Sequence, residues 1–395
     1  YGVYTPHTVD LSKHLRFGEE NVLVVSLDNT KGFAGGWAFI GNAGRATGIT
    51  RSVTLDVAAG PGYIADVYVR PGADLTEVRS QITLQSPAGS QTVPSSKLQW
   101  EVIDAKDNSQ LAQGSEAVEG FGGSRQVTFT TRVENIKPWS PDSPNLYWLK
   151  LRWLTDDEVL WDRHRQRFGL RRWSSQGRRL LLNGEPIYLR GEFGAYFYPV
   201  HVTTPTTREF WHRYLTRAKE LGFNYLNFAA RVCPPEMMEV ADEIGMVLQC
   251  GDHMTVLQKH RDQYREVWEP IVRTTRKYPS MGIYGFGGER NYYEGIIEQY
   301  QRQYDFIKSL HPECLVMPQQ AIRGIDYAFD EKGSKELPED PFSHHAERLE
   351  RYAKACDFYG HYSGGAFGYD YFGTGWREME QRFAIYHKPI SIHEL

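Results

Sequence analysis

The sequence has few of the features that would assign it to a specialised class. Its 4 cysteines among 395 residues lack the spacing of a metal site, so we expect small buried side chains rather than metal ligands or disulfides. No apolar run approaches the length of a membrane span, and the formal net charge of -4 supplies no basic stripe for nucleic acid. These absences predict a globular protein that neither crosses a membrane nor binds nucleic acid.

The sequence is rich in the apolar and aromatic residues that large cores need. The hydrophobic fraction is 41%, and a chain of 395 residues suggests two or three domains. Aromatic residues reach 13%, with 24 Tyr and 10 Trp. Such a content is typical of β-rich cores and also of surfaces that stack on sugar rings, so composition leaves both interpretations open.

The first 172 residues have the pattern of β-structure in two parts. In residues 1–59, an apolar run over 21–27 and an alternating run over 51–57 predict strands, which we interpret as the end of a larger β-sandwich whose beginning is absent. After the breaker Gly60-Pro61-Gly62, residues 60–172 carry short strands separated by turns, as in an immunoglobulin-like β-sandwich. The strands expected there cover residues 64–69, 77–84, 98–103, 126–133, 147–153 and 165–170.

From residue 173 to residue 395, strands alternate with helices. The expected strands cover residues 186–191, 224–228, 246–250, 281–286, 314–318, 357–361 and 390–393, and the expected helices cover 207–221, 235–244, 265–277, 293–310, a segment ending at 355, and 376–386. Alternation without a dinucleotide-binding glycine pattern favours a (β/α)₈ TIM barrel that lacks its last strand. Because such a barrel would expose open edges, we expect the sequence to be part of a longer polypeptide.

Two glutamates each follow an apolar run of this region. Glu289 closes the run that starts at residue 281, and Glu394 follows the run over 388–393. All strands of a barrel end at one mouth, so these carboxyls are expected to meet there as the catalytic pair of a glycosidase. Two close, partly buried carboxyls ionise separately, which leaves one as acid and one as nucleophile. The alternative is that each is an ordinary carboxylate in an ion pair, with Arg290 as the partner of Glu289.

A family resemblance rests on several motifs. They are Gly48-Ile-Thr-Arg-Ser-Val53, Trp139-Ser-Pro-Asp-Ser-Pro-Asn-Leu-Tyr147, Arg167-Phe-Gly-Leu-Arg171 and Leu182-Asn-Gly-Glu-Pro-Ile-Tyr-Leu-Arg-Gly191. With them, the sequence resembles glycoside hydrolase family 2, which includes β-galactosidases, β-glucuronidases and β-mannosidases. The resemblance implies that residues 1–59 are the end of the family's sugar-binding jelly roll. It also implies exo-acting, retaining hydrolysis of a β-linked carbohydrate substrate without a cofactor, with Glu289 as acid/base and Glu394 as nucleophile. It also suggests a periplasmic or secreted location, and it leaves a homo-oligomer open.

The sequence departs from the family pattern near both functional strands. The family usually has Asn before the acid/base, where this sequence has Gly288, so the amide that orients the sugar is either absent or supplied elsewhere, with Asn227 and Asn291 as the candidates. The second strand ends in Asn227-Phe-Ala-Ala-Arg231 instead of the family's Arg and Ser-His pair. Either the sugar differs, or the chain is an inactive carbohydrate-binding homologue. Arg231 would suit the acidic polysaccharide of a β-glucuronidase, and a surface arginine is the alternative.

Other strand ends supply further candidates for substrate binding. Asp252 and His253 follow the third expected strand, and His361 and Tyr362 follow the sixth. Tyr362 resembles the family's tyrosine that orients the nucleophile through a charge-assisted hydrogen bond. The alternative is a tyrosine that packs at the rim of the barrel without a role in catalysis. No metal site is expected.

Overall fold

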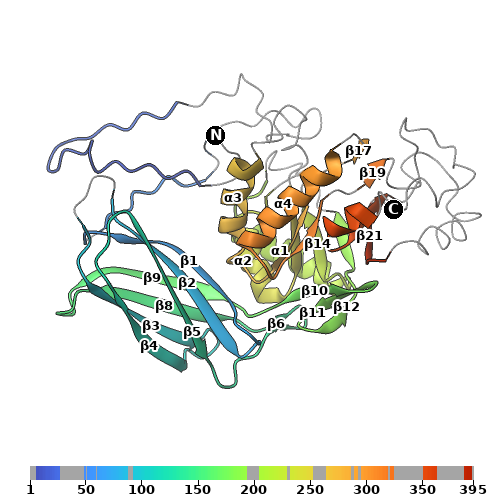
Figure 1. Ribbon diagram of the computed structural model, residues 1–395, viewed down its shortest axis with the longest axis horizontal. Helices are drawn as coiled ribbons and strands as arrows, with labels where there is room; N and C mark the ends of the chain where they lie inside the picture. Colours follow the sequence, from blue (N-terminus) through green and yellow to red (C-terminus); the bar gives the residue numbers. More distant parts are fainter. Residues whose placement is uncertain are drawn as a thin grey trace, which may run out of the picture.

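A β-sandwich and a parallel α/β unit lie side by side in the computed structural model (Figure 1). The structure describes residues 6–26, 49, 51–58, 60–87, 92–193, 204–228, 232–251, 264–285, 289–291, 295–318, 321–323, 350–362 and 387–393. The sandwich contacts the α/β unit where the parallel strands begin, because Arg171 and Arg70 bind the segments that precede two of them. The opposite ends of these strands face away from the sandwich.

The sandwich consists of two antiparallel sheets. One has the strand order β1 (Tyr63–Pro71), β2 (Glu77–Gln85), β5 (Ser124–Arg132), and the other has the order β4 (Gln110–Val118), β3 (Ser96–Asp104), β8 (Tyr147–Leu154), β9 (Leu160–Phe168). The six strands expected between residues 60 and 172 are therefore confirmed, with ends shifted by a few residues. Strand β4 was missed because it lies at a sheet edge, with a largely polar sequence in which Val118 alone is fully buried.

The two sheets share one core, which explains the aromatic content of this region. Trp100 on β3 stacks on Phe129 on β5, with ring centroids 4.7 Å apart. Val67, Ile82 and Leu149 are fully buried in the same cluster. Since each strand alternates buried and exposed positions, the pattern read from the sequence is sufficient to set which face of each sheet is inside.

The strands expected over residues 21–27 and 51–57 are wrong for the part described. Residues 21–26 and 51–57 belong to no helix or strand, and their apolar side chains, such as those of Val22 and Val57, are exposed. A strand persists only when a neighbouring strand satisfies its backbone groups, and the described residues offer these two segments no such neighbour. The jelly-roll assignment of residues 1–59 stays a prediction.

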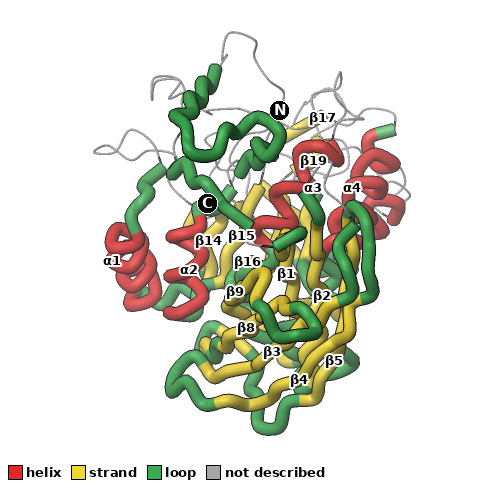
Figure 2. Tube along the Cα trace, turned by 90° about the vertical axis from the view of Figure 1, so that its left-hand side faces the viewer, coloured by secondary structure: helices red, strands yellow, loops and turns green. Residues whose placement is uncertain are grey.

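The α/β unit is built on a five-stranded parallel sheet whose strand order follows the chain. The order is β13 (Gly191–Phe193), β14 (Tyr225–Phe228), β15 (Val247–Gly251), β16 (Met281–Gly285), β18 (Leu315–Met317), and the helices are α1 (Arg208–Glu220), α2 (Pro235–Ile244), α3 (Tyr264–Thr275) and α4 (Ile296–Leu310). Helix α1 begins where the Thr207 side chain accepts a hydrogen bond from the Phe210 amide. Figure 2 shows the strands between α1 and α2 on one flank and α3 and α4 on the other.

The first expected strand of this unit, residues 186–191, is wrong. A three-stranded antiparallel sheet, called the hairpin below, occupies this region, formed by β10 (Trp173–Gln176), β11 (Arg179–Leu182) and β12 (Glu185–Ile187), and the parallel strand begins only at Gly191. The cause is the Asn183-Gly184 turn, where both residues have positive φ, 58° and 87°. Asn-Gly at two consecutive left-handed positions is the strongest short hairpin signal, and it reverses the chain here.

The two faces of the parallel sheet carry separate cores. On the outer face, Leu226, Leu248 and Tyr284 join the helices in one cluster. On the inner face, Tyr225, Val247, Ile283, Leu315 and Met317 join Trp173 and Leu182 of the hairpin in another. The hairpin therefore covers the inner face near the beginning of the strands, which places any open inner surface at their carboxyl ends.

Four further short strands lie beyond the five-stranded sheet. Strand β17 (Glu289–Asn291) pairs in parallel with β19 (Ala321–Arg323), and β20 (Tyr359–Tyr362) pairs in parallel with β21 (Ile390–His393). Strand β20 starts beside β18, because the Asp357 amide donates to the Val316 carbonyl at 2.8 Å. A small antiparallel pair, β6 (Trp139–Ser140) and β7 (Ser143–Pro144), lies in the proline-rich segment of the sandwich. Closure of the parallel strands into a barrel stays a prediction.

Two expectations from composition can be compared with the structure. All four cysteines are buried, as expected for small core side chains. In the residues with a described placement, no helix is long and apolar enough to cross a membrane.

Candidate active site

The inner face of the parallel sheet changes from apolar to polar along the strands. Near their beginning it is lined by Tyr225 and Val247, which pack on the hairpin. Because alternate residues of a strand share a face, Asn227 and Gln249 follow on the same face, two residues further along. Buried amides in an otherwise apolar core are costly unless they bind something, so this end of the sheet is the candidate site.

Asn227 and Gln249 are neighbours in this layer. They are register partners on β14 and β15, and their exposed fractions are 2% and 1%. Asn227 was a candidate for the amide that orients the sugar, and this role stays a prediction. Gln249 was not expected, although its signal was present in the sequence, since it is the lone polar residue in the buried run Val247-Leu-Gln-Cys250.

A tyrosine fixes the orientation of the Gln249 amide. The Tyr225 hydroxyl donates to Gln249 Oε1 at 2.5 Å. Burial raises the pKa of this phenol, so it keeps its proton and remains the donor. Since the carbonyl oxygen accepts from Tyr225, the Nε2 group of Gln249 is directed elsewhere, and it lies 3.1 Å from where a Cβ on Gly285 would be. The glycine leaves room beside an oriented N–H donor.

Glu289 lies on the backbone where the acid/base was expected, just beyond the carboxyl end of β16. It is the first residue of β17, and its register partner is Ala321 on β19. Asn291 is the third residue of the same strand and is paired with Arg323. Glu289 therefore has a backbone position held by pairing, which the sequence pattern did not indicate.

The structure brings Tyr362 next to the residue that precedes Glu394. Tyr362 on β20 is the register partner of His393 on β21, and His361 is the partner of Ile392. Strand β19, the partner of β17, in turn contacts β20. Glu289, Tyr362 and His393 thus belong to a series of adjacent strands (Figure 1).

Several expected site residues lie outside the described part of the chain. They are Arg231, Asp252, His253 and Glu394, together with Gly288. Their roles, like those of Glu289, Asn291, His361 and Tyr362, stay predictions. Among the residues that are described, no group of three or more His, Cys, Asp or Glu side chains could hold a metal ion.

A hollow elsewhere on the molecule is not part of this site. It holds about 360 Å³ and lies between β13 and α1, where Glu192 accepts a hydrogen bond from the Tyr214 hydroxyl at 2.5 Å. Glu192 is the register partner of Leu226, whose side chain packs on the helices. The hollow is therefore on the outer face of the sheet, opposite to Asn227 and Gln249.

Comparison with known proteins agrees with this arrangement. The sequence profile of the family "Glycosyl hydrolases family 2" matches residues 62–171, which form the sandwich. Beta-galactosidase BoGH2A of Bacteroides ovatus is 23% identical over 301 residues, covering 73% of this chain and 34% of that protein. A beta-galactosidase of Thermoanaerobacter pseudethanolicus is 23% identical over 257 residues, covering 62% of this chain and 33% of that protein.

The fold is shared with solved structures as well. The crystal structure of a glycosyl hydrolase family 2 member from Bacteroides cellulosilyticus covers 84% of this chain with a TM-score of 0.62 and 19% identity. This chain covers 42% of that structure, and it spans about a third of the length of the two curated relatives.

Proposed function

We propose that this chain, whose residues 62–171 match the profile of glycosyl hydrolases family 2, is a member of that family and an exo-acting, retaining glycoside hydrolase that removes a β-linked sugar from an oligosaccharide or polysaccharide. The observation that supports this most directly is the series of adjacent strands β17, β19, β20 and β21. It starts at Glu289 and ends one residue before Glu394, so both carboxylates of a catalytic pair would reach one pocket.

The proposed reaction has two steps. Glu289 donates the proton of its carboxyl to the glycosidic oxygen while the carboxylate of Glu394 attacks the anomeric carbon, so the bond to the leaving group breaks and a glycosyl ester forms. Glu289, now a carboxylate, then takes a proton from a water molecule that attacks the same carbon. The ester bond breaks, Glu394 is released, and the sugar leaves with its original anomeric configuration.

The buried amides would bind the sugar during these steps. In this proposal, Gln249 Nε2 donates to a sugar hydroxyl, because Tyr225 already occupies its carbonyl oxygen. Asn227, its register partner, would supply the amide that the family usually places before the acid/base. Tyr362 would orient Glu394, and Arg231, Asp252, His253, Asn291 and His361 would line the remaining pocket.

The parallel strands would enclose this pocket as a (β/α)₈ barrel. The supporting features are a strand order that follows the chain and a hairpin that covers the inner face at one end. An immunoglobulin-like sandwich and a jelly-roll segment would precede it, with boundaries near residues 59 and 172.

A panel of nitrophenyl β-glycosides tests the proposed function. We expect the protein to release nitrophenolate from at least one of them, and Glu394→Ala to reduce kcat by roughly 10³-fold or more, because the nucleophile is lost. Proton NMR of the first product should show the β-anomer. Glu220→Ala is the matched control, since Glu220 is an exposed partner of Arg217 on α1, and its activity should equal that of the wild type. Binding of sugars without nitrophenolate release would instead identify a carbohydrate-binding protein.

A further inference from the structure

Alternate residues at the end of the sandwich contact the start of β16. Arg171 donates to the carbonyls of Pro279 and Met281, and Arg167 binds Asp242, which accepts from the Ser280 amide. Between and beyond these arginines, Gly169 packs against Pro279 and Trp173 packs against Gly282. Alternate residues of an extended segment lie on one side of it, so a single edge of residues 167–173 follows residues 279–282.

Arg171 makes the most direct of these contacts. Its Nε donates to the Pro279 carbonyl at 2.9 Å, and its Nη2 donates to the Met281 carbonyl at 2.7 Å. The side chain is buried, with 5% exposed. A planar guanidinium has donors in fixed directions, so two carbonyls on either side of Ser280 are held at a set spacing.

His311 extends the contact along β16. Arg171 Nη2 lies 3.0 Å from His311 Nε2, and a guanidinium can only donate, so Nε2 accepts and Nδ1 carries the proton. Nδ1 then donates to the Tyr284 hydroxyl at 3.2 Å. That hydroxyl donates to Thr275 Oγ1 at 2.9 Å, because the Thr275 proton is given to the Ile271 carbonyl. His311 therefore links Arg171 to Tyr284, which lies near the carboxyl end of β16.

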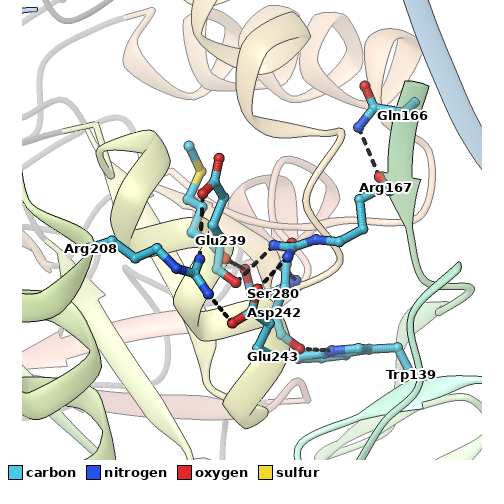
Figure 3. A network of polar contacts seen from close by, with 9 residues as sticks. Trp139, Gln166, Arg167, Arg208, Glu239, Asp242, Glu243 and Ser280 are labelled. Atoms are coloured by element: carbon cyan, nitrogen blue, oxygen red, sulfur yellow. Dashed lines mark hydrogen bonds and ion pairs between the residues drawn. The ribbon is translucent and has the colours of Figure 1, made fainter. Parts of the chain in front are cut away.

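Asp242 holds the residue between the two bound carbonyls. Its Oδ1 accepts from the Ser280 amide at 2.8 Å, and its Oδ2 lies 3.3 Å from Arg167 Nη2 (Figure 3). Arg167 also donates to Glu243 at 2.5 Å and to the Glu239 carbonyl at 2.8 Å. Arg167 thus acts through Asp242 of α2 on Ser280, the residue between the two carbonyls that Arg171 binds.

The start of β16 is also where its register is decided. Leu248 pairs with Met281 but Gln249 pairs with Ile283, so Gly282 is one extra residue in β16. The extra residue is what turns Ile283 to the inner face and Tyr284 to the helices. Trp173 packs on this residue so closely that a Cβ there would be 2.5 Å from its Nε1.

We propose that Arg167, Arg171, Asp242 and His311, here called the β16 anchor, are positioning residues that hold β16 in the one register that presents Glu289 to the pocket. The proposal rests on the proposed function for the role of Glu289. Loss of the extra residue would move everything after it by one position, about 3.3 Å along the strand, and exchange the two faces. A displacement of about 1 Å can already reduce catalysis by roughly 100-fold.

Arg171→Met tests the anchor through the leaving group. A displaced Glu289 donates its proton poorly, so hydrolysis of an unactivated phenyl β-glycoside should fall at least about tenfold more than hydrolysis of the dinitrophenyl β-glycoside, whose leaving group departs without a proton. Arg171→Lys should give an intermediate ratio, because one ammonium cannot reach both carbonyls and His311.

Arg70→Met is the matched control. It removes another contact between the sandwich and the α/β unit, the partly buried 2.7 Å ion pair with Glu313, and Arg70 does not contact β16 through this pair. We expect it to lower both activities by the same factor. An equal loss of both activities in Arg171→Met, or no loss at all, would overturn the proposal, because the arginine would then act on folding alone or on nothing.

Hydrogen exchange separates failure of the anchor from failure of the proposed function. If the wild type hydrolyses no glycoside, the function is refuted while the anchor is still tested. The amides of residues 280–285 should exchange faster in Arg171→Met than in Arg70→Met. Equal exchange in the two variants would refute the anchor.

Discussion

Gly222 and Gly245 each follow one of two neighbouring helices but have different surroundings. Both have positive φ, 90° after α1 and 77° after α2. A Cβ on Gly222 would meet nothing within 4 Å, whereas a Cβ on Gly245 would lie 2.1 Å from the Pro141 carbonyl oxygen of the sandwich. Gly222 is needed for its backbone conformation alone, and Gly245 also for close packing.

We therefore expect Gly245→Ala to destabilise the protein more than Gly222→Ala. The left-handed conformation costs about 1–2 kcal/mol at either position. At Gly245 the clash with the Pro141 carbonyl oxygen adds roughly 1–3 kcal/mol, because neither the segment at Pro141 nor the end of α2 can move without breaking other contacts. Urea unfolding of the two variants measures the difference. Equal free energies of unfolding would show that the segment at Pro141 yields to the methyl group.

At the residue scale, the sequence was sufficient for the helix ends but not for the pocket floor. The helices expected over 207–221 and 235–244 end close to these positions, since α1 has its C-cap at Leu221, directly before Gly222, and α2 has its C-cap at Gly245. Gln249 was overlooked because a single polar residue in a buried strand can also be a satisfied core group. Only the alternation of faces against the hairpin shows that its side chain lies on the inner side.

At the element scale, β16 depends on two buried ionisable groups whose pKa values are shifted in opposite directions. Burial raises the pKa of Asp242 to about 6, although Arg167 lowers it in part. Burial and the nearby Arg171 hold the pKa of His311 well below its usual value of 6.5. The folded protein therefore takes up a proton at Asp242 more readily than the unfolded chain, and at His311 less readily.

The two groups should oppose each other as the pH falls. The contribution of Asp242 increases as the pH falls through about 6 towards 3.8, because the folded state binds the proton first. The contribution of His311 is present above 6.5 and is lost on acidification, because the unfolded chain binds the proton first. Between pH 6 and 4, the change in the free energy of unfolding from these two groups is therefore the gain from Asp242 minus the loss from His311.

Asp242→Asn should expose the His311 effect. Asparagine keeps an oxygen for the Ser280 amide but cannot titrate, so between pH 6 and 4 the variant should lose stability faster than the wild type, by up to about 1.4 kcal/mol per pH unit. His311→Gln should show the reverse: between pH 6 and 4 it should lose less stability on acidification than the wild type, because the increasing contribution of Asp242 is no longer opposed. Chemical unfolding at several pH values checks both. Parallel profiles for wild type and Asp242→Asn would contradict the assignment.

The elements themselves were predicted well where burial sets a clear period. Helix α2 begins and ends where expected, and β14, β15, β16 and β18 lie within about one residue of their predicted positions. The failures have other causes. The hairpin before β13 depends on a turn signal that was overlooked, and strands β17 and β19 are too short to show a period.

At the scale of the whole molecule, charged contacts join the sandwich to the α/β unit. Asp66 on β1 binds Arg276 and Lys277 at 2.7 and 2.8 Å. Arg276 also lies over the Tyr68 ring, 4.1 Å from its centroid, and Glu313 accepts from the Tyr68 hydroxyl at 3.1 Å. Since both carboxylates and Arg276 are largely buried, separation of the two parts would leave charged groups without partners.

We therefore expect the sandwich and the α/β unit to unfold in one transition. All four cysteines lie in the α/β unit, so their reaction with a thiol reagent reports that unit alone. Exchange of the β2 and β3 amides reports the sandwich. The two signals should share one urea midpoint in the wild type and separate in Arg276→Met, which removes the central cation. Two midpoints in the wild type would show that the interface is too weak to couple the parts.

The anchor on β16 has a consequence for how such proteins can be recombined. A topological division near residue 172 looks natural, since the sandwich ends there and the parallel strands follow. In the proposed anchor, however, Arg167 and Arg171 belong to the segment that ends the sandwich, although they hold β16 of the α/β unit. A chimaera joined at residue 172 would receive the residues at positions 167 and 171 from the other sandwich, and these residues would then contact β16 of this α/β unit. Active chimaeras should therefore be joined before Arg167, so that residues 167–173 stay together with the α/β unit.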